Sequence, residues 1–175
     1  MSGILRAVSS FAAHGRYQEV RSGLPPAGWL DVPGRFRISY PWPWQEFSDH
    51  SGVVSADGHA AAGEVLGALR APRSQGVAVV LLWRAPGSLR SLEPAAAARF
   101  ERLYGGSCLG VRRVRVAGAA GVIVDIDLPA GERVSRALVT DAGDHVVHVE
   151  LRVPVGAARG YRPHLDAMLA SWSWQ

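Results

Sequence analysis

The chain has 175 residues, 48% of them hydrophobic, with a formal net charge of +4 and one cysteine. This length and apolar content suit one folded domain and argue against intrinsic disorder. The single cysteine excludes a disulfide framework and a cysteine-rich zinc site, and no apolar run is long enough to form a membrane-spanning helix.

The basic charge carries little functional information. All 19 basic residues are arginine, and the chain has no lysine and no asparagine, a bias typical of a GC-rich coding genome. The arginines are scattered, with a dense group only at 112–115, whereas a surface that follows phosphates usually shows a longer basic stripe. We therefore expect no nucleic-acid binding.

Residues 1–27 are predicted to be an N-terminal arm, followed by one domain over residues 28–175. The arm ends in the turn-rich sequence SGLPPAG, and Ile4, Val8 and Phe11 within it fit a short helix. Its first twenty residues lack the continuous apolar segment of a secretory signal peptide. This pattern favours a cytoplasmic protein, and we expect a bacterial one.

The next segments are mostly extended. GWLDV precedes RFRISY, in which alternate residues are apolar, and Pro41 and Pro43 close that strand. Residues 48–60 are expected to form a loop. EVLGALRAP is ambiguous between strand and short helix, with Gly67 favouring a strand, and GVAVVLLWRAP is typical of a buried strand.

Two helices are expected in the second half of the chain. SLRSLEPAAAARFERLYGG has apolar residues at helical spacing, with Pro94 suited to a first turn and Gly105 placed to end the helix. The C-terminal segment has an amphipathic pattern from Tyr161 to Trp172. His164, near its start, is expected to face solvent.

Four extended segments lie between these helices: LGVRRVRV, GVIVDIDL, RVSRALVT and DHVVHVELRV. The turns that join them are short, so consecutive strands are expected to pair as an antiparallel meander. The element order predicts an α+β fold, an antiparallel β-sheet with helices packed on it.

Short motifs at both ends of the domain suggest a family. FRISYP at 36–41 is followed by Trp44, the mid-chain helix reaches Phe100, and the last helix closes on LASW at 169–172. This order resembles the PsbP-like α/β/α sandwich family, which includes PsbP, DcrB and LpqN-type proteins. The resemblance covers residues 28–174 and implies that Trp44 folds back over a sheet face. It also implies a binding, adaptor or accessory role.

The aromatic loop after Pro41 motivates the leading functional hypothesis. Trp42 has a proline on each side, and both packing and partner contact are open to it. Exposed beside Phe47, it would form an apolar contact patch. We expect a non-catalytic accessory module that binds a protein partner or a small apolar ligand through its sheet face and this loop, with Arg113 and Arg115 contributing.

Strand alternation suggests an alternative, a small tailoring or cyclising enzyme of a bacterial biosynthetic pathway. Asp125 and Asp127 lie opposite the apolar residues of their strand, as His148 and Glu150 do in theirs. If the strands are neighbours, these side chains and nearby arginines converge on one sheet surface. His148 could then act as an acid or base, or the surface could be a solvated face with cross-strand ion pairs.

No cofactor or metal is expected. Asp49, His50, Asp57 and His59 are ligand-type residues without a recognised metal spacing. Cys108 needs a nearby histidine to act as a nucleophile, and the sequence places none beside it. The glycine pairs lack the strand-to-helix context and the lysine of a phosphate-binding loop.

Overall fold

The computed structural model describes residues 16–47, 63–71 and 78–175. Within them, an eight-stranded sheet has the order β1-β7-β8-β9-β10-β6-β5-β4, and a three-stranded sheet has the order β11-β3-β2. The strands of the large sheet are β1 (Gln18–Glu19), β4 (Gln45–Glu46), β5 (Glu64–Arg70), β6 (Val79–Pro86), β7 (Ser107–Val116), β8 (Ala119–Asp127), β9 (Glu132–Asp141) and β10 (His145–Pro154). Those of the small sheet are β2 (Pro26–Val32), β3 (Phe36–Pro41) and β11 (Ser173–Trp174).

The expected antiparallel meander is confirmed in β7 to β10. Each of these strands pairs antiparallel with the next, and β6 adds to the free side of β10. Ala117 and Gly118 both have positive φ between β7 and β8, the geometry of a tight hairpin turn that matches strand twist. The large sheet is mixed, because β1 pairs parallel with β7.

The mid-chain helical segment is divided at Pro94. α2 (Leu89–Leu92) precedes a short 3-10 turn at Glu93–Ala95, and α3 (Ala96–Tyr104) follows. The expected single helix is therefore interrupted, because proline has no N–H to donate to the preceding turn. Gly105 ends α3 in the left-handed conformation, as its position predicts.

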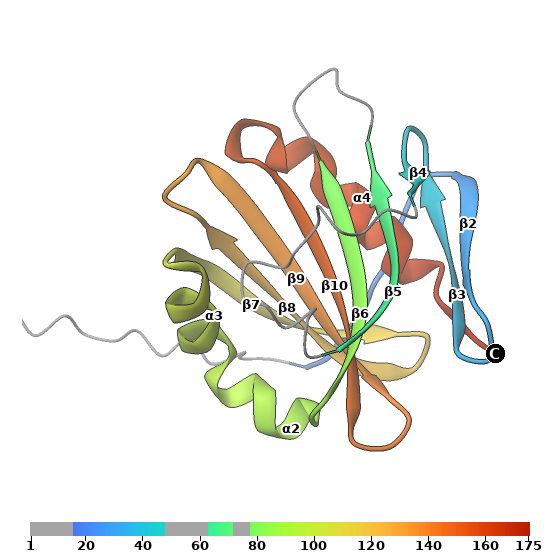
Figure 1. Ribbon diagram of the computed structural model, residues 1–175, viewed down its shortest axis with the longest axis horizontal. Coiled ribbons are helices and arrows are strands. Elements are labelled where there is room, and N and C mark those ends of the chain that lie inside the picture. Colours follow the sequence, from blue (N-terminus) through green and yellow to red (C-terminus); the bar gives the residue numbers. More distant parts are fainter. Residues whose placement is uncertain (1–15, 48–62, 72–77) are drawn as a thin grey trace, which may run out of the picture.

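Helices cover both faces of the large sheet. α2 and α3 pack on one face, and α4 (Ala158–Ala170) lies between the other face and the small sheet (Figure 1). The larger apolar core fills the α4 side, where Trp172 stacks on Phe36 with ring centroids 4.0 Å apart. A second core lies under α3 and includes Phe100. The expected α+β architecture is confirmed.

Part of the expected N-terminal arm lies within the described residues and forms strands. Residues 16–27 of the expected arm include β1 and the first two residues of β2. The expected short helix at Ile4, Val8 and Phe11 and the expected loop at 48–60 lie outside the described residues. EVLGALRAP contains strand β5, as Gly67 favoured.

Candidate functional site

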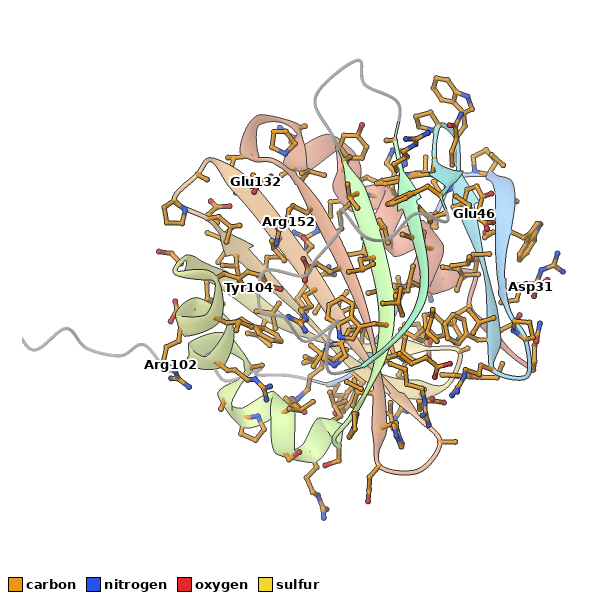
Figure 2. The ribbon with its side chains drawn as sticks, viewed as in Figure 1. Asp31, Glu46, Arg102, Tyr104, Glu132 and Arg152 are labelled. Atoms are coloured by element: carbon orange, nitrogen blue, oxygen red, sulfur yellow. The ribbon has the colours of Figure 1, made fainter. Side chains whose placement is uncertain are left out.

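A group of polar side chains lies on the sheet face that α3 covers. We call Tyr104 of α3, Arg136 of β9, and His148 and Glu150 of β10 the polar cluster (Figure 2 labels Tyr104). Arg136 is fully buried, and its Nη1 donates to the Tyr104 hydroxyl at 2.8 Å. That hydroxyl donates to Oε2 of Glu150 at 2.6 Å. One phenol therefore joins a buried guanidinium to a buried carboxylate.

Aromatic rings surround the cation of the polar cluster. The Arg136 Cζ lies 4.5 Å from the ring centroid of Trp83 and 4.6 Å from that of Phe100. Trp83 also stacks on His148, with centroids 4.8 Å apart. Nε of Arg136 lies 3.2 Å from Nδ1 of His148. Because arginine can only donate, Nδ1 accepts and the proton of the neutral imidazole lies on Nε2.

Of the four expected catalytic residues, the structure places His148 and Glu150 on one face of the sheet. Asp125 and Asp127 lie on the opposite face. Glu150 pairs with Arg136 and so faces α3, together with His148. Asp125 pairs with Ser135, which pairs with Leu151 of the α4-side core. The expectation that all four residues share one surface is therefore wrong. The alternation within each strand was right, but the apolar residues of β8 and β10 face opposite cores.

On the α4 side, the two aspartates have polar partners. Arg133 donates to both carboxylate oxygens of Asp127, at 2.6 and 3.0 Å. These hydrogen bonds hold the pKa of Asp127 below its ordinary value. Asp125 accepts a hydrogen bond from the Ser135 hydroxyl at 2.5 Å. Neither carboxylate is near His148, so no acid–base pair forms between them.

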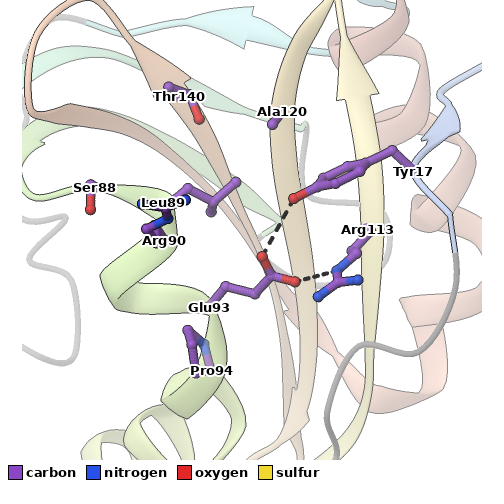
Figure 3. Close-up of a pocket in the computed structure, with 9 residues that line it drawn as sticks. All are labelled: Tyr17, Ser88, Leu89, Arg90, Glu93, Pro94, Arg113, Ala120 and Thr140. Atoms are coloured by element: carbon purple, nitrogen blue, oxygen red, sulfur yellow. Dashed lines mark hydrogen bonds and ion pairs between the residues drawn. The ribbon is translucent and has the colours of Figure 1, made fainter.

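Arg113 lies at a pocket of about 670 Å³ between the sheet and the start of the helical segment (Figure 3). Its Nε donates to Oε1 of Glu93, and the Tyr17 hydroxyl donates to Oε2 at 3.4 Å. Leu89 and Thr140 also line the pocket. The arginine is thus paired with a carboxylate at the wall of the pocket.

Arg115 lies two residues after Arg113 on β7. Its Nη1 donates to the carbonyl of Gly118 at 3.0 Å, across the hairpin turn that ends the strand. Its guanidinium also lies 5.3 Å from the ring centroid of Tyr17. These contacts give Arg115 a structural role in holding the turn.

The two tryptophans of the aromatic loop have opposite environments. Trp44 is 3% exposed and packs in the α4-side core, as the resemblance implied. Its Nε1 donates to Nδ1 of His164 at 3.1 Å, and its ring meets that of Tyr161 edge-on at 5.7 Å. Trp42 is 79% exposed. His164 is half-buried rather than solvent-facing, and burial lowers its pKa.

Phe47, the other aromatic residue of the expected contact patch, is half-buried. It packs against a small cluster of Ala68, Leu81 and Trp83, and the guanidinium of Arg70 lies 6.0 Å from its ring centroid. Phe47 therefore contributes to packing at the edge of the large sheet. Trp42 is the strongly exposed ring of this loop.

Two residues of the polar cluster, Arg136 and Tyr104, were not predicted from the sequence. Arg136 shares a face of its strand with the apolar Val134 and Leu138, so it occupies a position where the strand pattern predicts a core side chain. That mismatch was the available signal. Tyr104 showed none, because its contact with Glu150 spans two elements far apart in sequence.

Other candidate positions are structural or lie elsewhere. Cys108 is buried in the α3-side core, and burial raises the pKa of its thiol, so the thiolate is disfavoured. Within residues 16–47, 63–71 and 78–175, no three potential metal-ligating side chains cluster. The loop residues Asp49, His50, Asp57 and His59 lie outside the described residues. In the described part of the chain, no helix has the length and apolarity to cross a membrane.

Comparison with known structures decides the fold. The solution structure of cyanobacterial PsbP (CyanoP) from Synechocystis sp. PCC 6803 superimposes with a TM-score of 0.54 over 89% of this chain and 97% of that chain. The fold is PsbP-like. The sequence identity is 9%, so the likeness extends to the fold and does not identify a DcrB or LpqN-type protein. Neither a protein-family model nor a curated protein sequence matches the chain.

Proposed function

We propose that this PsbP-like protein is a non-catalytic accessory module that binds a protein partner through its aromatic loop. The observation that supports this most is the contrast between Trp42, which is 79% exposed, and Trp44, which is buried two residues later. A tryptophan left in water costs solvation free energy that a partner surface removes. Tryptophan is also among the residue types that contribute most to protein–protein binding.

The base of the loop is well anchored. Trp44 is enclosed by α4-side core residues, and its indole N–H is satisfied by His164. The backbone N–H of Trp44 donates to the carbonyl of Pro41 at 3.2 Å, which closes the turn around Trp42. An anchored loop loses less conformational entropy when it binds, so this geometry favours tight contact.

The outer face of the small sheet extends the proposed surface. Trp29 on β2 is 45% exposed, and the Arg37 guanidinium lies 4.3 Å from its ring centroid. Asp31 lies 3.7 Å from Arg37 and points away from the large sheet (Figure 2). Exposed tryptophan and arginine side chains on the outer face of a sheet are typical of a protein interface rather than of a closed ligand cavity.

The geometry gives less support to the alternative, a small tailoring or cyclising enzyme. His148 is 6% and Glu150 4% exposed, so a substrate has little access to either. Asp125 and Asp127 lie on the other sheet face. Hydrogen bonds within the polar cluster join its own members, which suits a role in packing. A bacterial source and a cytoplasmic location stay predictions of the sequence.

Site-directed photo-crosslinking tests the proposal. Trp42 is replaced by benzoylphenylalanine in the full chain, and Leu109, an exposed residue on β7, is replaced in a matched control. Irradiation in the native host should give a discrete protein adduct from position 42 and none from position 109. Equal crosslinking at both positions, or none at position 42, would contradict the proposal.

A further inference from the structure

A second pocket, of about 500 Å³, lies between the large sheet and the start of α4. Four arginines line it: Arg112 from β7, Arg133 from β9, and Arg159 and Arg162 from α4. The chain brings these residues together from three separate elements. The local sequence pattern does not show this convergence, and the pocket shares no residue with the aromatic loop.

Three carboxylates lie near the four arginines of this pocket, so one positive charge is not balanced. Arg133 uses its Nε–H and one Nη2–H group to bind both carboxylate oxygens of Asp127, at 2.6 and 3.0 Å. In contrast, Arg112 and Arg162 are 3.7 and 3.8 Å from their nearest carboxylate oxygens, on Asp166 and Asp125. These distances are longer than a hydrogen bond, so the N–H groups concerned stay available.

Two further observations point to an anion. Nε of Arg112 is buried without a hydrogen-bond partner in the described part of the chain. Arg159 is exposed and forms no hydrogen bond or ion pair with the described residues. An unsatisfied buried donor favours a bound acceptor, since leaving it unpaired costs free energy.

The start of α4 adds to the positive potential. Ala158 and Arg159, its first two residues, line the pocket, and the N-cap residue Ala157 supplies no side-chain hydrogen bond. The N-terminal end of a helix carries partial positive charge. The N–H of Ala158 itself already donates to the carbonyl of Val155, in the 3-10 turn that precedes α4. Val155 N–H donates to the carbonyl of Gly131 at 2.9 Å, which ties this end of the helix to the β8–β9 turn.

From this geometry we propose that the pocket binds a small ligand with a phosphate group. Guanidinium groups pair with phosphate oxygens through two parallel hydrogen bonds, and Arg112, Arg159 and Arg162 have donors available for this. Asp125 lies at the same wall and disfavours a second anionic group there. The pocket volume is within the usual range for small-molecule sites.

Calorimetric titration at low ionic strength tests this proposal with three probes: inorganic phosphate, glycerol phosphate, and phosphatidylcholine vesicles that contain phosphatidic acid. The full-length protein should bind at least one of them. In the double variant Arg159→Gln/Arg162→Gln, binding should weaken at least about tenfold, since charge-assisted hydrogen bonds are lost. The control variant Arg102→Gln, at an exposed position in the last turn of α3, should bind as the wild type does.

A variant that is expected to bind more tightly distinguishes a loss of binding from misfolding, because a misfolded protein would not gain affinity. Asp125→Asn removes a negative charge from the pocket wall, and its amide oxygen still accepts from Ser135. It should bind the same probe several-fold more tightly, because like-charge repulsion is relieved. Tighter binding of glycerol phosphate than of vesicles would indicate a soluble ester, and the reverse a lipid headgroup. Absence of binding to all three probes, or equal binding by wild type and double variant, would overturn the proposal.

Discussion

Replacing Arg136 by methionine should strongly destabilise the protein. Arg136 is fully buried and donates hydrogen bonds to Tyr104 and His148, with Glu150 3.9 Å away. Methionine fills part of the space and keeps apolar contact with Trp83, but it leaves the Glu150 carboxylate without its buried cation. Removing one partner of a buried ion pair typically costs about 3–5 kcal/mol.

The structure favours the lower end of that range. Arg152 stays within 3.3 Å of Oε1 of Glu150, and the Tyr104 hydroxyl continues to donate to Oε2. We therefore expect Arg136→Met to lower the free energy of unfolding by about 3 kcal/mol. In the double variant Arg136→Met/Glu150→Gln the buried charge is removed, and about half of this loss should be recovered.

Urea unfolding at neutral pH, followed by tryptophan fluorescence, measures both variants. Arg102→Met serves as the matched control, because Arg102 is exposed on α3 and should change stability by less than about 0.5 kcal/mol. Two results would contradict the role assigned to the buried ion pair. One is a free energy of unfolding for Arg136→Met within about 1 kcal/mol of the wild-type value, and the other is a double variant that is no more stable than Arg136→Met.

Three further outcomes are expected. Trp44→Ala should lower the free energy of unfolding by about 3–5 kcal/mol through the cavity it leaves, whereas Trp42→Ala should change it by less than about 0.5 kcal/mol in the same urea titration. The pKa of Asp127 is lowered by Arg133, so its stabilising contribution is present above the ordinary carboxyl pKa and is lost as pH falls through the lowered value. Arg133→Gln should therefore reduce the stability difference between neutral and strongly acidic pH, and an unchanged difference would argue against this link. Cys108 should react with a thiol reagent only as fast as the protein opens, and rapid labelling of the native protein would contradict its burial.

The strands and helices with strong local patterns could be predicted from the sequence. The antiparallel pairing of β7 to β10 was predicted correctly, because apolar alternation and short turns are local signals. β11 was not predicted, because a two-residue strand has no pattern of its own and forms only by pairing with β3. The interruption at Pro94 was not predicted: the sequence indicated one helix with Pro94 in its first turn, and proline fits both a first turn and an interruption.

The candidate site was less predictable, because it depends on register and on which core each strand faces. Asp125 and His148 each alternate correctly within their strands, but the sheet is covered on both faces, so apolar residues do not identify a common side. Arg136 was missed because a buried cation is stabilised by partners far away in sequence. By contrast, the prolines beside Trp42 were a local signal, and its side chain is strongly exposed.

The central claim, that the aromatic loop binds a protein partner, is tested most directly by native mass spectrometry of the protein gently isolated from its own host. We predict a second polypeptide in fixed stoichiometry with the wild-type chain. The same complex should be absent from Trp42→Ala and present in Leu109→Ala, which loses a similarly exposed apolar side chain on β7. A complex that survives Trp42→Ala unchanged, or a wild-type chain that carries no polypeptide, would contradict the account.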